Sequence, residues 1–190
     1  MIGALPTSLE VGGKEWEIRS DYRIILRIFE AMEDNELTEA DKLYVALDLV
    51  YVDFEHMPRD LYQEAYTKAS RFMECHDRAD DKKNPKLINW EKDEHMIFPA
   101  INAVAGCEVR SVGYMHWWTF LGYFESVDNE SLWSFVLSIR QKRANGKKLE
   151  KYEQDFYRKN MYLCDVKKPE ERKTAEQSLS DMFDMLEEGG

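Results

Sequence analysis

The sequence lacks the features of several common protein classes, beginning with paired cysteines. Its three cysteines, Cys75, Cys107 and Cys164, are an odd number, widely spaced and without a CxxC pair. They indicate neither a disulfide framework nor a zinc ribbon, and reduced thiols in a cytoplasm are the simpler interpretation. The absence of a run of about 18 apolar residues argues against a membrane-spanning helix. The start, MIGALPTSLEVGG, does not resemble a signal peptide, so we expect the protein to remain where it is made.

Sequence motifs that mark common catalytic sites are also missing. The nine glycines lie mostly at turns or singly, and none has the spacing of a nucleophile elbow, a phosphate-binding loop or a dinucleotide fingerprint. The four histidines lie about twenty residues apart, so no pair can bind zinc from one helical face, as HExxH does. The sequence therefore favours a protein that is not an enzyme and that uses no metal or cofactor.

The best candidate for acid–base chemistry is the run Asp93, Glu94 and His95. Consecutive helical residues point about 100° apart, so these side chains cannot converge without help from elsewhere in the fold. We interpret the run as a solvated helical turn, and a metal-dependent enzyme that uses Asp93, Glu94, His95 or His116 stays as an alternative. For the adjacent Cys75 and His76, a structural or incidental role is the simpler interpretation.

What the chain does contain is ample apolar material and an excess of acid. Of its 190 residues, 44% are hydrophobic and 33% are charged, and the net charge is -11. The apolar share suffices for the core of one domain, or of one domain with an appendage. Such an acidic chain repels phosphate backbones, so a basic or apolar protein is a better candidate partner than nucleic acid.

A short β-hairpin is predicted at the N-terminus. Apolar and polar residues alternate over 9–11 and 16–18, on either side of a Gly-Gly pair at 12–13. The glycines can supply the positive φ angles of a tight turn, and a two-residue turn places Leu9 opposite Trp16. Because an isolated hairpin is marginal in water, a helix should cover its apolar face.

Helical spacing of apolar residues then takes over and predicts a mainly α fold, a helical bundle after the short N-terminal β-hairpin. Ser20 or Asp21 can cap the first helix. Thr38 begins the second, with Asp41 in the capping-box position. The predicted buried stripes of the first three helices are Ile25, Leu26, Phe29 and Met32; Leu43, Ala46, Leu47 and Val50; and Leu61, Ala65, Ala69 and Phe72.

Helical patterns continue in the second half of the chain. The polar stretch over 77–85 predicts a loop, and the next helix is predicted over 90–105, where Pro99 has to kink it or lie near a boundary. Another helix carries an apolar stripe from Leu132 to Ile139. A further short stripe follows at Tyr152, Phe156 and Tyr157.

The last segment, residues 170–188, follows Pro169 and has seven acidic residues against two basic ones, a net charge of -5. Apolar residues line one side of the predicted helix: Leu179, Met182, Phe183 and Leu186. Because a helix of this length is marginal alone, it has to dock, either on its own domain or on a partner. We therefore divide the chain into a β-hairpin plus helical domain over 1–165 and an acidic amphipathic C-terminal helix over 166–190.

An aromatic helix is predicted over 114–126, with a buried stripe of Met115, Trp118, Leu121 and Phe124. Within it, His116, Trp117 and Trp118 are three consecutive bulky residues that cannot all face one core. Since Trp118 fits the stripe, Trp117 or His116 is predicted to face another element or a partner. Packing in the core is the alternative that we favour.

A basic stretch over 140–151 contrasts with the acidic composition. Its members are Arg140, Lys142, Arg143, Lys147, Lys148 and Lys151, against Glu150 alone. Internal charge balancing or contact with an acidic partner is favoured over nucleic acid, because the rest of the chain is strongly acidic.

A resemblance to a known family is carried by four stretches: LPTSLEVGGKEWEIRSDYRIILRIFE, DNELTEADK, MHWWTFLGYFESV and IRQKRANGKKLEKYEQDFYRKN. They resemble a family of small phage proteins that is encoded just before the tape-measure gene in phages of Gram-positive bacteria. The resemblance covers nearly all of residues 5–163, and its most specific elements are the His-Trp-Trp run and Ile139-Arg140 with the lysines that follow. These are packing patterns without a catalytic signature.

The resemblance implies a tail assembly chaperone that works in the cytoplasm of the bacterial host. Its expected partner is the tape-measure protein; further candidates are the tail tube protein, a chaperone from an upstream reading frame and a second copy of the chain. A structural tail-completion or adaptor protein retained in the virion is the alternative. No membrane contact is expected. The residues expected to contact a partner are Trp117, Trp118, Phe120, Phe124, Arg140, Lys142, Arg143, Lys147, Lys148, Leu179, Met182, Phe183 and Leu186.

Overall fold

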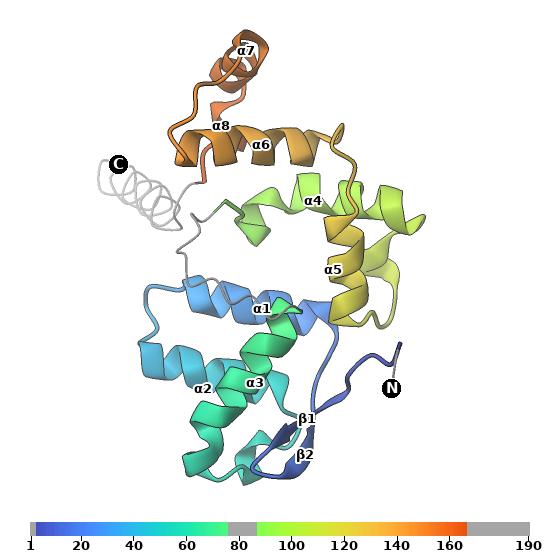
Figure 1. The fold of residues 1–190 in the computed structure, drawn as a ribbon, viewed down its shortest axis with the longest axis vertical. Coiled ribbons are helices and arrows are strands. Elements are labelled where there is room, and N and C mark those ends of the chain that lie inside the picture. Colours follow the sequence, from blue (N-terminus) through green and yellow to red (C-terminus); the bar gives the residue numbers. More distant parts are fainter. Residues whose placement is uncertain (1–2, 76–86, 167–190) are drawn as a thin grey trace, which may run out of the picture. The chain divides into compact units, whose positions relative to one another are not determined.

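The computed structural model describes residues 3–75 and 87–166, which form eight α-helices and one β-hairpin (Figure 1). The mainly α fold predicted from the sequence is therefore confirmed. The chain divides into two compact units, a division that the sequence pattern did not predict. The first unit comprises residues 1–84 and 90–135, and the second comprises 85–89 and 136–190. The predicted loop over 77–85 and all of the predicted C-terminal helix over 166–190 except Val166 lie outside the described residues.

The first unit contains the hairpin and most of the helices. Its elements are β1 Ser8–Val11, β2 Lys14–Glu17, α1 Tyr22–Glu33, α2 Glu39–Val50, the 3-10 helices η1 Phe54–His56 and η2 Arg59–Leu61, α3 Tyr62–Glu74, α4 Trp90–Ala105, the 3-10 helix η3 Val109–Ser111 and α5 Trp117–Glu125. Helix α6, Leu132–Ala144, begins in the first unit and continues into the second. The second unit adds α7 Lys151–Lys159 and α8 Met161–Cys164.

The N-terminal hairpin has the predicted register. Strand β1 pairs antiparallel with β2, and Leu9 lies opposite Trp16. Gly12 and Gly13 form the turn with φ angles of 58° and 74°, which residues with a Cβ atom rarely adopt. Helix α3 packs against β1, as the need for a covering helix predicts. A Cβ atom on Gly12 would lie 2.8 Å from Leu61 Cδ1, so the Leu61 side chain would have to shift to admit it.

The helix starts follow the predicted capping residues. Asp21 caps α1 by accepting a hydrogen bond from the Arg23 backbone N–H. Thr38 and Asp41 form the reciprocal capping box of α2. The carbonyl groups at the other end of α2 accept hydrogen bonds from the Arg19 guanidinium, at 2.7 Å from Asp48 O and 2.8 Å from Tyr51 O. A cation there complements the negative end of the helix dipole.

The predicted buried stripes are mostly confirmed in α2 and α3 and partly wrong in α1. Helix α2 buries Ala46, Leu47 and Val50, and α3 buries Ala65, Ala69 and Phe72. Helix α1 instead buries Tyr22, Ile25 and Ile28, whereas Leu26, Phe29 and Met32 are only half-buried. Its inward face is rotated because Tyr22 stacks on Phe120, with ring centroids 4.2 Å apart.

Helix α4 has the predicted bounds, and Pro99 lies inside it. The alternative that Pro99 marks a boundary is therefore wrong. Pro99 is exposed, while Met96, Ile97, Phe98 and Ile101 of the same helix are buried. A helix-interior proline lacks one backbone hydrogen bond, and packing of the opposite face compensates for this loss.

Among the described residues, none of the helices is both long and apolar enough to cross a membrane. All three cysteines are free thiols: Cys75 is half-buried, Cys107 is exposed and Cys164 is buried.

Candidate partner-binding surface

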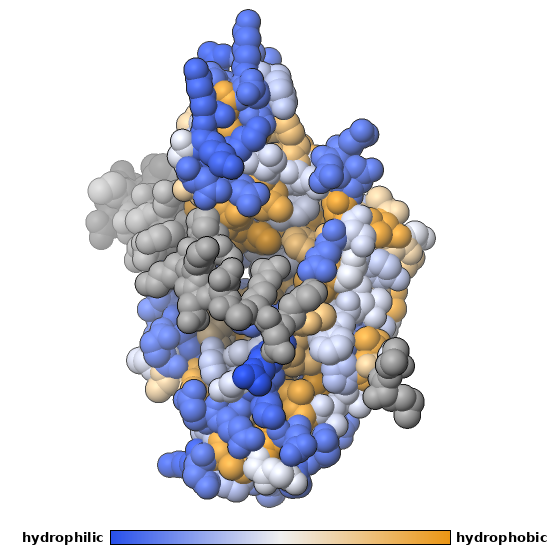
Figure 2. Space-filling view, viewed as in Figure 1, coloured by the Kyte–Doolittle hydropathy of each residue, from blue (hydrophilic) through white to orange (hydrophobic). Residues whose placement is uncertain are grey.

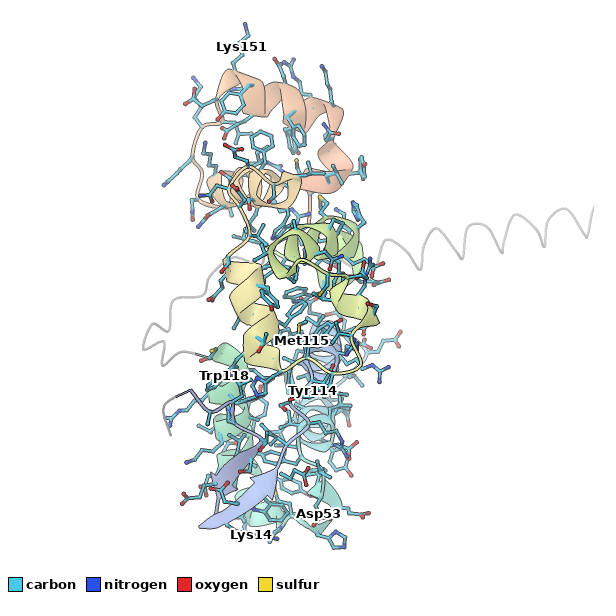
Figure 3. The ribbon with its side chains drawn as sticks, turned by 90° about the vertical axis from the view of Figure 1, so that its right-hand side faces the viewer. Lys14, Asp53, Tyr114, Met115, Trp118 and Lys151 are labelled. Atoms are coloured by element: carbon cyan, nitrogen blue, oxygen red, sulfur yellow. The ribbon has the colours of Figure 1, made fainter. Side chains whose placement is uncertain are left out.

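The four aromatic residues proposed from the sequence as partner contacts belong to the first unit and are largely buried there. Trp117 and Phe120 are buried, with 2% and 0% of their surface exposed, and Trp118 and Phe124 are half-buried. The Trp117 indole N–H donates to Met73 O at 2.8 Å, and that of Trp118 donates to Phe72 O at 2.9 Å. The predicted stripe is thus wrong in phase, since Trp117 faces the core more fully than Trp118. Figure 3 labels Trp118 where α5 lies beside α3.

His116 explains this phase. It is the N-cap of α5, so the helix starts at Trp117 and not at the predicted residue 114. Its Nδ1 accepts from the Trp118 backbone N–H at 3.0 Å, and its Nε2 lies 2.9 Å from Pro6 O. Because a carbonyl can only accept, Nε2 carries the hydrogen and the ring is the neutral Nε2–H tautomer. His116 is therefore a buried structural residue.

The basic stretch divides into neutralised and exposed cations. Arg140 is buried in the second unit and donates to Leu87 O at 2.8 Å and to Leu163 O at 2.5 Å. Its guanidinium thus joins α6 to α8 and to the segment 87–89. These contacts make Arg140 part of the core, where it is closed to a partner.

The next two cations are paired within the second unit. Lys142 Nζ lies 2.5 Å from Glu153 Oε1, and Arg143 pairs with Asp165 and lies over the Tyr157 ring. The hydrogen bond to the Glu153 carboxylate raises the pKa of Lys142. Burial pushes the pKa of Glu153 upward, but the hydrogen bonds from Lys142 and from the Glu150 N–H outweigh it and lower the pKa. Internal charge balancing, one of the two alternatives from the sequence, accounts for these residues.

The cations that follow are exposed. Lys147, Lys148 and Lys151 lie in and after the turn at Gly146, which has a φ angle of 65°. Hydrophilic side chains gather over this loop and α7 in Figure 2. In Figure 3 the Lys151 side chain extends outward from the start of α7. Of the described residues proposed from the basic stretch, Lys147 and Lys148 are thus open to a partner.

Large apolar side chains are exposed on α7 and on α8. Tyr152 is 62% exposed, Met161 is 51% exposed and Tyr162 is 63% exposed. We call these residues, together with the exposed cations of the loop and of α7, the α7–α8 surface. Its members are Lys147, Lys148, Lys151, Tyr152, Arg158, Lys159, Met161 and Tyr162.

Sequence reasoning missed the apolar part of this surface. It assigned Tyr152 to a packing stripe with Phe156 and Tyr157, but α7 turns Glu153 inward instead. Glu153 accepts a hydrogen bond from the Glu150 N–H in a capping box, so the outward position falls to Tyr152. Glu153 at the third helical position could have indicated the capping box and hence the exposure of Tyr152. The sequence offered no comparable signal for the exposure of Met161 and Tyr162.

Charge sets the second unit apart from the rest of the chain. Residues 136–166 contain eight basic residues and four acidic ones, a net charge of +4, in a protein whose total is -11. Three of the acidic side chains, Glu153, Asp165 and Asp155, are paired with Lys142, Arg143 and Arg158, which leaves Lys147, Lys148, Lys151 and Lys159 against Glu150 among the exposed residues. The α7–α8 surface therefore presents a local excess of positive charge.

The residues proposed for chemistry do not come together. Asp93 is buried, whereas Glu94 and His95 are exposed, and His95 Nδ1 lies 2.9 Å from Lys92 O. The three side chains thus diverge, as helical geometry predicts. His76, and with it the Cys75-His76 pair, lies outside the described residues.

One group of side chains in the described ranges lies close enough to hold a cation. Its ligand atoms belong to Asp53, Glu55 and His56 and lie within 4.8 Å of one another. All three residues are exposed, and His56 Nδ1 lies 2.6 Å from Asp53 Oδ1. Exposed groups of this kind remain hydrated and paired among themselves, so the geometry alone assigns them no metal.

The four apolar residues proposed at the C-terminus, Leu179, Met182, Phe183 and Leu186, lie outside the described residues. Of the thirteen residues proposed from the sequence, Lys147, Lys148 and the paired Arg143 are exposed, and Trp118, Phe124 and Lys142 are partly accessible.

Comparison with known proteins agrees with the resemblance at the level of the family. A sequence profile described as Bacteriophage Gp15 protein matches residues 1–164, which is most of the chain. No curated protein and no solved structure matches it. The chain therefore belongs to the Bacteriophage Gp15 protein family and is a bacteriophage protein.

Proposed function

We propose that this phage protein is a tail assembly chaperone that binds the tape-measure protein and keeps it soluble while the tail is built. The proposal combines the family with the α7–α8 surface. A tape-measure protein is a very long, largely helical chain with apolar faces that stay exposed until the tail tube surrounds it. A chaperone has to cover those faces reversibly and leave as the tube subunits polymerise.

The exposed side chains of Tyr152, Met161 and Tyr162 are the observation that carries the proposal. Each is more than half exposed although it is large and mainly apolar. Tyrosine offers a rigid apolar ring with a polar end, and methionine adapts its shape to varied surfaces. Such side chains suit a partner whose apolar stripes repeat with small differences along its length.

The surrounding cations narrow the kind of partner. Lys147, Lys148 and Lys151 favour a helix whose apolar stripe is bordered by acidic residues, while the net charge of -11 disfavours a phosphate backbone. One surface of this size binds weakly, and many copies along one tape-measure chain would gain from avidity. Weak individual contacts also allow release, which assembly requires.

Co-expression of this protein with fragments of its phage's tape-measure protein tests the proposal. We expect soluble complexes that co-purify, and we expect mass spectrometry to find none of this protein in mature virions. Failure of every fragment to co-purify contradicts the chaperone function. Stoichiometric presence in mature tails would instead support a structural tail-completion or adaptor protein retained in the particle.

The proposal includes no catalytic step. Metal analysis of the purified protein and assembly assays with His56→Ala and His95→Ala phage test this part. Both histidines are exposed, so neither substitution disturbs the core. A bound metal together with failed assembly in either variant would contradict a purely binding function.

A further inference from the structure

We infer that the acidic segment 170–188 of the same chain occupies the α7–α8 surface, so that a partner has to displace it. The first half of this inference concerns the chain alone. The second half, displacement by a partner, rests on the proposed function.

Charge complementarity supports this occupant. The second unit carries a net charge of +4 over 136–166, and both the cations of its loop and of α7 and the apolar side chains of Tyr152, Met161 and Tyr162 are exposed. Segment 170–188 has a net charge of -5 and carries Leu179, Met182, Phe183 and Leu186 at helical spacing. An acidic border around an apolar stripe is the counterpart of a basic border around apolar side chains.

The point where the chain leaves the second unit also supports it. Asp165 is held by the Arg143 guanidinium and by the Tyr157 hydroxyl, whose Oη lies 3.0 Å from Asp165 Oδ1. These contacts fix the exit beside α6 and α7. Segment 170–188 begins four positions after Val166, the last described residue.

The short connection favours binding within one chain. Residues 167–169 span at most about 11 Å when extended, which keeps the segment close to α7. A short tether gives an effective concentration on the order of millimolar, so even a weak contact is populated. A separate acidic protein would need a far higher affinity to compete at cellular concentrations.

Hydrogen exchange of the full chain, without a partner, tests the docking. We expect the amides of 170–188 to be protected, and Lys147→Glu with Lys148→Glu to speed their exchange roughly fivefold, the effect of losing two exposed charge pairs. The matched control reverses Arg27 and Arg59, two exposed cations of the first unit, to glutamate. This control should leave the exchange of 170–188 unchanged.

Exchanging the positive and negative charges between the surface and the segment makes the test specific. Asp181→Lys and Asp184→Lys, added to the Lys147→Glu, Lys148→Glu chain, should bring protection back. Equal exchange in all variants overturns the inference, and so does protection that falls on dilution, because the occupant would then be a second copy. Tyr162→Ser should also speed exchange, since it removes apolar contact without changing charge.

Displacement is tested separately with a tape-measure fragment. The fragment should speed exchange of 170–188 as it binds, and its affinity should rise when Asp181 and Asp184 are changed to asparagine. A fragment that binds without affecting the exchange would sink displacement and leave the chaperone function intact. Absence of any fragment binding, with docking still observed, would sink the proposed function alone.

Discussion

The two units of this protein bury different kinds of side chain. In the first unit the largest fully buried residues are aromatic: Trp117, Trp133, Tyr22, Tyr51 and Phe120. In the second unit, Arg140 and Glu153 are buried among a few aliphatic residues. Aromatic burial depends little on pH or salt, whereas a buried carboxylate depends on its protonation state and on its partner.

The difference bears on how each unit can be used. An aromatic core stabilises the first unit as a scaffold, and its exposed apolar residues are dispersed over several elements. In the described part of the second unit, Arg140 and the Lys142–Glu153 pair hold three helices together. Its large side chains, Tyr152 and Tyr162, are thereby left on the surface for other contacts.

The largest expected effect is in the aromatic core. Trp117→Ala removes a fully buried indole and its hydrogen bond to Met73 O, so the free energy of unfolding should fall by about 3–5 kcal/mol. Urea denaturation followed by circular dichroism measures this loss. Val104→Ala, at an exposed position of α4, should stay within about 0.5 kcal/mol of the parent. Comparable losses in both variants would contradict an aromatic core.

A smaller loss is expected when the charged core of the second unit is altered. Glu153→Gln removes the charge that Lys142 meets and weakens the capping box of α7. We expect a loss of about 1–3 kcal/mol in the stability of this unit, as for other buried charged hydrogen bonds. Hydrogen exchange of the α6–α8 amides is the measurement.

Lys142→Met and the double variant complete a thermodynamic cycle around this pair. Effects that simply add would mean that Lys142 and Glu153 do not stabilise each other.

Acid should weaken the second unit through the same carboxylate. The pKa of Glu153 is lowered in the folded protein from an ordinary value of 4.5. Its stabilisation is therefore complete above that ordinary value and is lost as the pH falls through the folded pKa. Hydrogen exchange between pH 5 and pH 3 should show α6–α8 loosening in the parent, with a flatter pH dependence in Glu153→Gln. Identical pH profiles would refute this assignment.

The smallest expected effect is local and lies in the first unit. The Arg110 side chain and N–H, with Asn102, lower the pKa of Glu108 to about 2. NMR titration of the Glu108 carboxyl should find this value, and Arg110→Gln should move it toward 4.5. Because Glu108 is exposed, unfolding of the first unit should change little in this variant. A large drop in stability would mean that charged contacts matter in the first unit as much as in the second.

Local rules were sufficient for much of the fold. The Gly-Gly turn defined the hairpin register, Thr38 and Asp41 marked the start of α2, and the bounds of α4 followed from apolar spacing. Each of these features depends on residues within a few positions of one another.

Features set by distant residues could not be predicted in this way. The phase of α5 depends on His116, which bonds to Pro6 O, 110 positions earlier. In the basic stretch, the first three cations contact Leu163, Glu153 and Asp165, and the sequence pattern did not show that these residues lie within reach. Exposure of Tyr162 is likewise a tertiary outcome, because α8 turns Leu163 and Cys164 inward.

The central claim, that the α7–α8 surface binds the tape-measure protein, is tested most directly by one comparison of affinities. Tyr162→Ser and Tyr44→Ser each replace an exposed tyrosine, 63% and 55% exposed, on the second and first unit respectively. Calorimetric titration with a co-purifying tape-measure fragment should show roughly tenfold weaker binding for Tyr162→Ser, as for a modest hot spot, and parental binding for Tyr44→Ser. Equal affinities for the two variants, or a loss confined to Tyr44→Ser, would contradict the claim.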